Sequence, residues 1–96
     1  MTNVFHMKIN NFERIAEILK VLAHPVRLQI VHQLLMKRIL NVSELQQHLS
    51  MPQSTVSQHL YKMKNHKVVV CERKGSEVYY RVDDEQVKQT MRVLIC

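Results

Sequence analysis

Residues 41–65 read NVSELQQHLSMPQSTVSQHLYKMKN and contain two short amphipathic segments on either side of Met51-Pro52. Asn41 precedes Glu44 by three residues, a capping-box spacing that predicts the start of a helix. Pro52 suits the start of the next helix, because the N–H that proline lacks has no partner in a first turn. The segment therefore predicts a helix-turn-helix over about residues 42–65, whose second helix can enter the major groove of DNA.

Apolar residues recur at spacings of three and four on both sides of this segment, which predicts flanking helices. One helix is expected over residues 11–23, and a second is expected to begin at Pro25 and reach about Lys37. After the segment, Asp83 is expected to cap a last helix over residues 84–95. The flanking sequence is therefore mainly helical.

The pattern between residues 67 and 82 is extended rather than helical. Val68–Cys71 and Val78–Val82 are rich in β-branched and aromatic residues, which predicts two strands. Gly75, the one glycine of the sequence, lies at the centre of a basic turn between them. Four helices, a hairpin and a final helix predict a mainly α fold with a small β-hairpin, the winged helix-turn-helix.

The length of 96 residues predicts one domain spanning residues 1–96. Hydrophobic residues make up 46% and charged residues 23%, a composition typical of a globular protein. No apolar run approaches the roughly 20 residues that span a bilayer, so we expect a cytoplasmic protein with no membrane partner. Two cysteines are too few for a disulfide scaffold.

The net charge of +6 favours a polyanionic partner, and six basic residues against two acidic ones lie between Gln53 and Val82. Glutamine can form hydrogen bonds with the edge of adenine, and serine and threonine can form them with bases or phosphates. Double-stranded DNA is therefore the expected partner. The expected contacts from the recognition helix are Gln53, Ser54, Thr55, Ser57, Gln58, His59 and Lys62. The expected contacts from the wing and to the DNA backbone are Lys64, Arg73, Lys74 and Arg81.

A small chain with a limited core often gains stability by forming oligomers. The first and last helices carry apolar stripes that are suited to a contact with a second copy. The residues expected in this dimer interface are Phe12, Ile15, Leu19, Val87, Met91, Leu94 and Ile95.

Residues 22–31 (LAHPVRLQIV), 41–45 (NVSEL) and 52–60 (PQSTVSQHL) resemble the ArsR/SmtB family of winged-helix repressors, and residues 75–80 resemble the wing of that family. The resemblance extends from about Arg14 to about Leu94. It implies a homodimer, joined through its first and last helices, that represses transcription by binding an inverted-repeat operator. It also implies base contacts from Gln53, Ser54, Ser57 and Gln58, with Arg73 and Lys74 in the wing.

Many members of the family sense metals, but the usual ligands are missing from this sequence. A Cys-x-Cys pair is replaced by Asn41 and Ser43. Asp84 matches the first ligand of a second site, whereas Gln86 stands where a histidine is expected. The six histidines show no clear ligand spacing. We therefore expect no metal and no cofactor, and the sequence identifies no small-molecule ligand.

Cys71 and Cys96 leave a thiol-switched regulator open as an alternative. Members of the family it resembles that switch through a disulfide place cysteines on the second and last helices, and the second helix here has none. A protein-interaction or RNA-binding module is another alternative, because the fold does not determine the function. The sequence shows no phosphate loop, acid pair or nucleophile set, which argues against an enzyme.

Overall fold

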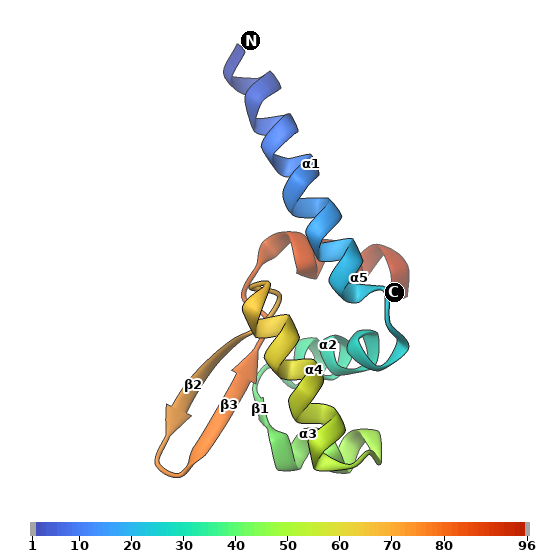
Figure 1. The fold of residues 1–96 in the computed structure, drawn as a ribbon, viewed down its shortest axis with the longest axis vertical. Coiled ribbons are helices and arrows are strands. Elements are labelled where there is room, and N and C mark those ends of the chain that lie inside the picture. The colour runs from blue at the N-terminus through green and yellow to red at the C-terminus, as the bar shows by residue number, and fades with distance from the viewer. Residues whose placement is uncertain (1, 96) are drawn as a thin grey trace.

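The structure, a computed structural model, describes residues 2–95, with side chains described over residues 11–95. It confirms a mostly helical winged-helix fold with a small antiparallel sheet (Figure 1). The elements are α1 (Thr2–Leu22), α2 (Pro25–Lys37), β1 (Leu40–Asn41), α3 (Val42–Leu49), α4 (Gln53–Asn65), β2 (Val70–Lys74), β3 (Glu77–Arg81) and α5 (Glu85–Ile95).

The predicted helix starts around the helix-turn-helix are confirmed. The Asn41 side chain accepts a hydrogen bond from the Glu44 N–H (2.8 Å), and the Glu44 carboxylate accepts one from the Asn41 N–H (2.9 Å). This reciprocal pair satisfies two N–H groups that an α-helix leaves unpaired at its start. Pro25 lies in the first turn of α2, where His24 Nδ1 accepts from the Val26 N–H at 3.1 Å.

Two predicted helix boundaries were wrong. Helix α1 begins at Thr2 rather than near residue 11, since no glycine or proline interrupts the preceding residues. Helix α5 is capped by Asp84 and not by Asp83, because Asp84 Oδ1 accepts from the N–H groups of Gln86 (2.8 Å) and Val87 (3.2 Å). Both aspartates have suitable spacing, and only the three-dimensional contacts distinguish them.

The sheet also differs from the predicted hairpin. A third strand, β1, pairs with β3 through Leu40 opposite Tyr80 and gives the strand order β1-β3-β2. Strand β2 begins at Val70, two residues later than expected. Val68 and Val69 instead donate their N–H groups to the Met63 carbonyl at 2.8 and 3.4 Å, so they close the end of α4 and pack in the core.

The hydrophobic core lies where the five helices of the described chain meet the base of the sheet. Ile30, Leu45 and Leu60 are fully buried and bring together α2, α3 and α4. Val87 and Met91 attach α5 to the same core. Helix α1 extends beyond the other elements toward the N-terminus (Figure 1). Within residues 2–95, no helix is long and apolar enough to span a bilayer.

Candidate nucleic-acid interface

Helix α4 has one buried face and one exposed polar face. Val56, Leu60 and Met63 are 0% exposed and fix the orientation of the helix against the core. Because a helix repeats every 3.6 residues, the side of α4 opposite these three residues points outward. The exposed side chains on that outer face are Gln53, Ser54, Gln58, Tyr61, Lys62, Lys64 and Asn65, with Thr55 and Ser57 half-buried at its edges.

His59, which we expected among the DNA contacts, lies on the side of α4 that packs against α2. Its Nδ1 accepts a hydrogen bond from Arg27 Nε at 3.2 Å, and its ring lies 4.5 Å from that of His24. Burial, and then the charges of His24 and Arg27, lower the pKa of His59. A neutral, half-buried imidazole is poorly suited to neutralise a phosphate, so His59 positions α4 on α2.

Tyr61 is a surface residue that the sequence reading missed. It is 68% exposed, more than is usual for a tyrosine, whose burial is ordinarily intermediate. It lies three residues after Gln58 and seven after Ser54, so the three side chains share one helix face. A helical projection anchored on Val56 would have placed it there. Its hydroxyl adds a hydrogen-bonding group to the polar face.

The hairpin of β2 and β3 presents two basic side chains near its tip. Arg73 and Lys74 end β2, and Gly75 adopts a positive φ of 64° in the turn that follows. Lys74 Nζ lies 5.9 Å from the centroid of the Tyr79 ring, within the range of a cation–π contact. Both cations are exposed and suited to contact phosphates.

Arg81, also expected in the wing, lies at the opposite end of the hairpin. It pairs with Val70 in the sheet, whereas the tip pairs Lys74 with Glu77. Its guanidinium lies 3.6 Å from the Glu72 carboxylate. Arg81 therefore contributes its charge at the base of the hairpin.

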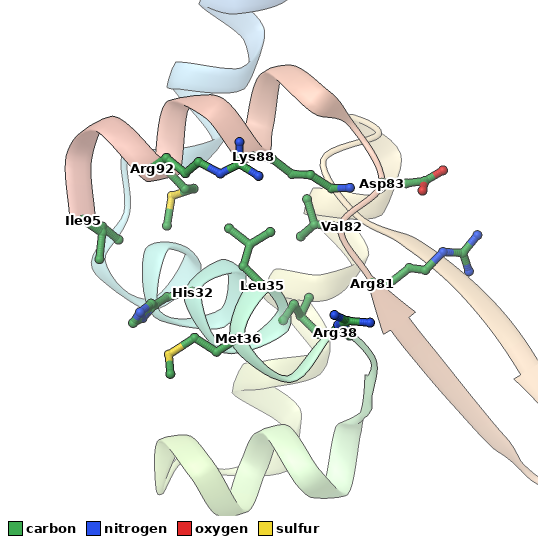
Figure 2. Close-up of a pocket in the computed structure, with 12 residues that line it drawn as sticks. His32, Leu35, Met36, Arg38, Arg81, Val82, Asp83, Lys88, Arg92 and Ile95 are labelled. Carbon is green, nitrogen blue, oxygen red and sulfur yellow. The ribbon is translucent and has the colours of Figure 1, made fainter.

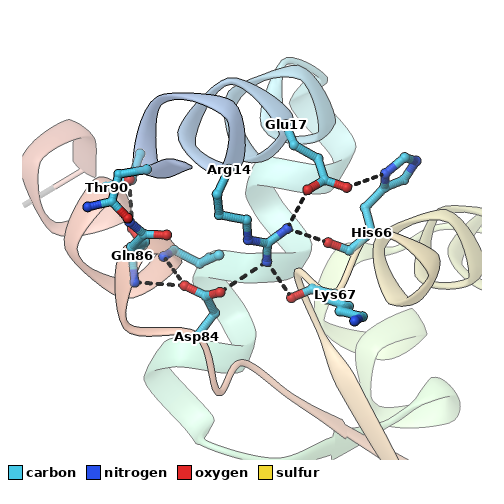
Figure 3. Close-up of polar contacts among 9 residues, drawn as sticks. Arg14, Glu17, His66, Lys67, Asp84, Gln86 and Thr90 are labelled. Carbon is cyan, nitrogen blue, oxygen red and sulfur yellow. Dashed lines mark hydrogen bonds and ion pairs between the residues drawn. The ribbon is translucent and has the colours of Figure 1, made fainter. Parts of the chain in front are cut away.

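Arg14 of α1 connects the residues that follow α4 with the residue that caps α5 (Figure 3). From α1 it donates to the carbonyls of His66 (2.7 Å) and Lys67 (2.9 Å), directly after α4. It also donates to Glu17 at 2.9 Å and to the Asp84 carboxylate at 3.0 Å. One guanidinium thus fixes the end of α4 against α1 and the cap of α5.

The carboxylates around Arg14 are held in their charged form. Partial burial by itself raises the pKa of Asp84, but hydrogen bonds from Arg14, Val87 and Gln86 outweigh it and leave that pKa below its ordinary value. Hydrogen bonds from His66 and Arg14 lower the pKa of Glu17. Asp84 is the residue that the family resemblance matched to a metal ligand. In this structure its carboxylate is paired with the guanidinium of Arg14.

The other candidate sensor residues lie apart. Within the described part of the chain, no three His, Cys, Asp or Glu side chains gather as a metal site would require. Asn41 and Ser43 belong to the start of α3, where Asn41 serves as the cap. Cys71 is a half-buried thiol in β2. Cys96 lies outside the described residues.

The expected dimer residues divide into two groups. Val87 and Met91 are 0% and 2% exposed and belong to the core of the single chain. Phe12 (66%), Leu19 (48%) and Leu94 (62%) are exposed, as is Ile95, and Ile15 is half-buried. Five of the seven large hydrophobic side chains exposed within residues 11–95 lie on α1 and α5, including Val93, which the sequence reading did not name.

Comparison with known proteins identifies the family. Residues 24–69 match the model of the bacterial regulatory protein, arsR family. The chain is 47% identical over 79 residues to the transcriptional repressor PagR of Bacillus anthracis, covering 82% of this chain and 79% of that protein. It is 31% identical over 93 residues to the biofilm growth-associated repressor of Xylella fastidiosa, covering 93% and 81%.

The fold comparison agrees with the sequence comparison. The crystal structure of PagR from Bacillus anthracis superimposes with a TM-score of 0.83 at 43% identity, covering 90% of this chain and 98% of that one. These relatives are transcriptional repressors and not enzymes. The chain therefore belongs to the ArsR family and is a DNA-binding transcriptional regulator.

Proposed function

We propose that this chain is a homodimeric repressor, acting in the cytoplasm, that reads an inverted-repeat operator with helix α4 in the major groove. The observation that carries the proposal is the exposed polar face of α4, fixed from behind by Val56, Leu60 and Met63. Gln53, Ser54, Ser57 and Gln58 supply hydrogen-bonding groups for base edges. Tyr61 and Lys62 extend the face toward the DNA backbone.

The wing and the C-terminal end of α4 supply charge. Lys62 and Lys64 follow the base-reading turns, and Arg73 and Lys74 lie near the hairpin tip. Contacts of these residues with phosphates would fix the position of the dimer without selecting a sequence. Two-fold symmetry places equivalent half-sites about 10 bp apart or at a multiple of that distance.

The direct test is binding of the purified chain to DNA upstream of its own gene, against random competitor DNA at physiological salt. We expect a preference of about 10³ or more for the specific fragment. The operator is then located by footprinting. Uniform weak binding to every fragment would contradict the proposal and favour a protein-interaction role.

Lys74→Ala is expected to weaken binding to every DNA sequence alike. Loss of one phosphate contact should reduce the slope of log K against log salt concentration by about 1. Titrations at several salt concentrations measure this slope. Lys37→Ala removes an exposed cation at the end of α2 and serves as the control. A slope for Lys74→Ala equal to that of the control would exclude the phosphate contact.

Leu19→Glu is expected to separate the proposed dimer. Phe12, Ala16 and Leu19 are exposed and share one face of α1, distinct from the face that buries Ile18. In a symmetric dimer each of the two chains would bury one such carboxylate in the contact. This should raise the dimer dissociation constant about 100-fold or more. Sedimentation velocity measures the change.

Lys37→Glu places the same carboxylate on an exposed position of α2, outside the stripe, and should leave the dimer intact. Both substitutions fall on exposed positions, so both variants should fold. A Leu19→Glu variant that stays dimeric at the wild-type concentration would place the interface elsewhere.

A further inference from the structure

A groove of about 660 Å³ runs between α2 and α5 (Figure 2). This volume falls within the range of about 300–1,000 Å³ typical of small-molecule sites. Leu35 contributes apolar surface from α2, and Ile95 contributes it from α5. Met36 and Ile95 lie toward one end, whereas Arg38 and Arg81 lie toward the other.

The groove is strongly cationic. Arg38, Arg81, Lys88 and Arg92 line it, with Asp83 as the one carboxylate among the lining residues. Arg81 and Lys88 lie 3.6 and 3.7 Å from Glu72 and Glu85, which are themselves more than half exposed. Neither Arg38 nor Arg92 forms an ion pair with another residue of the described part of the chain. Their charges are therefore available to an anion.

Arg38 is held in the groove at a conformational cost. It has φ 75° and ψ −50°, and the Ile39 N–H donates to the Lys37 carbonyl at 3.0 Å, which together define a strained γ-turn. Glycine adopts a positive φ without this cost and is common at helix ends. Strained non-glycine residues are concentrated at functional sites. An arginine at this turn is consistent with a role for its side chain.

We propose that this groove binds one small amphipathic carboxylate, with its carboxylate at Arg38 and its apolar chain against Leu35 and Met36. The combination of apolar residues with an excess of cationic ones along the groove fits such a molecule better than it fits a purely apolar compound or a bare inorganic anion. A bidentate contact from Arg38 would fix the carboxylate. The apolar chain would then lie toward Met36 and Ile95.

Hydrogen bonds connect the two helices that form the groove to helix α4. Arg27, on α2, donates a hydrogen bond to His59 of α4. Helix α5 begins after its cap residue Asp84, whose carboxylate accepts a hydrogen bond from Arg14. A ligand that shifts α2 against α5 would therefore change the position of α4. This regulatory consequence rests on the proposed DNA-binding function, whereas ligand binding itself does not.

The first test uses octanoate as the probe, with octanol and acetate as comparisons, in calorimetric titrations of the wild-type chain. Octanoate is expected to bind saturably, with one molecule per chain, and at least about 10-fold more tightly than either comparison, because only octanoate satisfies both ends of the groove. Equal binding of octanoate and octanol would overturn the proposal, as would no saturable binding of octanoate.

Arg38→Gln tests the position of the carboxylate. It should weaken octanoate binding about 10-fold, since a charge-assisted hydrogen bond is lost. Lys37→Gln removes the neighbouring cation, which does not line the groove, and should leave the affinity unchanged. Equal weakening by the two variants would mean that net charge, and not the groove, attracts the probe.

A second variant guards against an effect of Arg38→Gln on folding. Met36 is 63% exposed at the groove, so Met36→Glu should fold and should repel octanoate, whereas Met36→Gln should retain binding. Unchanged octanoate binding by Met36→Glu would overturn the proposed site. Operator titrations with and without octanoate then measure the regulatory effect separately, so failure of DNA recognition would not be confused with failure of ligand binding.

Discussion

Replacing Gln53 and Gln58 together with alanine is expected to reduce the preference for operator over random DNA about 100-fold. Each bidentate contact between a glutamine and adenine contributes about 1–3 kcal/mol of discrimination. Both side chains are exposed on α4 and make no hydrogen bond to another described residue, so their loss should not change stability. Competition binding with operator and random fragments measures the preference.

The same variant should retain its salt-dependent binding to random DNA, because the lysines and arginines near the interface remain. Gln29→Ala removes a glutamine from an exposed position of α2 and should leave the preference at the wild-type level. If the double variant and this control kept the same operator preference, α4 would not be the reading helix.

Local signals in the sequence were sufficient to predict the helix-turn-helix and the start of the helix before it. The Asn41 and Glu44 capping box depends on residues three apart, and the position of Pro25 follows from its own geometry. Both features were predicted correctly because their partners lie within one helical turn. The burial of Val56, Leu60 and Met63, which are spaced by four and three residues, likewise follows from the period of the helix alone.

Features that depend on distant partners could not be predicted in this way. Strand β1 has two residues and exists because Leu40 pairs with Tyr80, forty positions away. His59 has the polar character of its neighbours on α4, and its contacts with Arg27 and His24 hold it toward α2. Arg14 reaches partners 52 to 70 residues away in the sequence, so no spacing rule identifies it.

The last helix shows what the spacing of apolar residues cannot predict. Its apolar residues form one stripe in the sequence, yet Val87 and Met91 are buried in the chain while Leu94 and Ile95 remain exposed. Periodicity shows that a face is apolar but not whether the core or a second chain covers it. Substitution of Met91 by aspartate would therefore disrupt folding, and exposed Leu19 is the better test of the dimer.

Arg14→Gln is expected to destabilise the chain by about 2–3 kcal/mol, because it breaks hydrogen bonds to charged and backbone groups that are partly buried. The Arg14 side chain is 23% exposed and that of Asp84 is 26% exposed. Urea denaturation at neutral pH measures the loss. Arg73→Gln, at an exposed wing position, should change stability by less than about 0.5 kcal/mol.

Acid should weaken the same cluster, and the direction follows from the pKa of Asp84. That pKa is lower in the folded chain than the ordinary value of 3.8, so the folded state favours the charged carboxylate. The stabilisation is complete well above pH 3.8 and is lost as the pH falls through the lower folded value. The lowered pKa of exposed Glu17 acts in the same direction.

Asp84→Asn removes this titration, since an amide keeps an oxygen that can cap α5 but carries no charge to pair with Arg14. The variant should be less stable than wild type at pH 7, and the difference should shrink as the pH falls below about 4. Urea denaturation across this pH range measures both curves. A stability difference that stays constant down to pH 2 would mean that the charge of Asp84 does not hold α1, α4 and α5 together, and that Arg14 acts through the carbonyls of His66 and Lys67 alone.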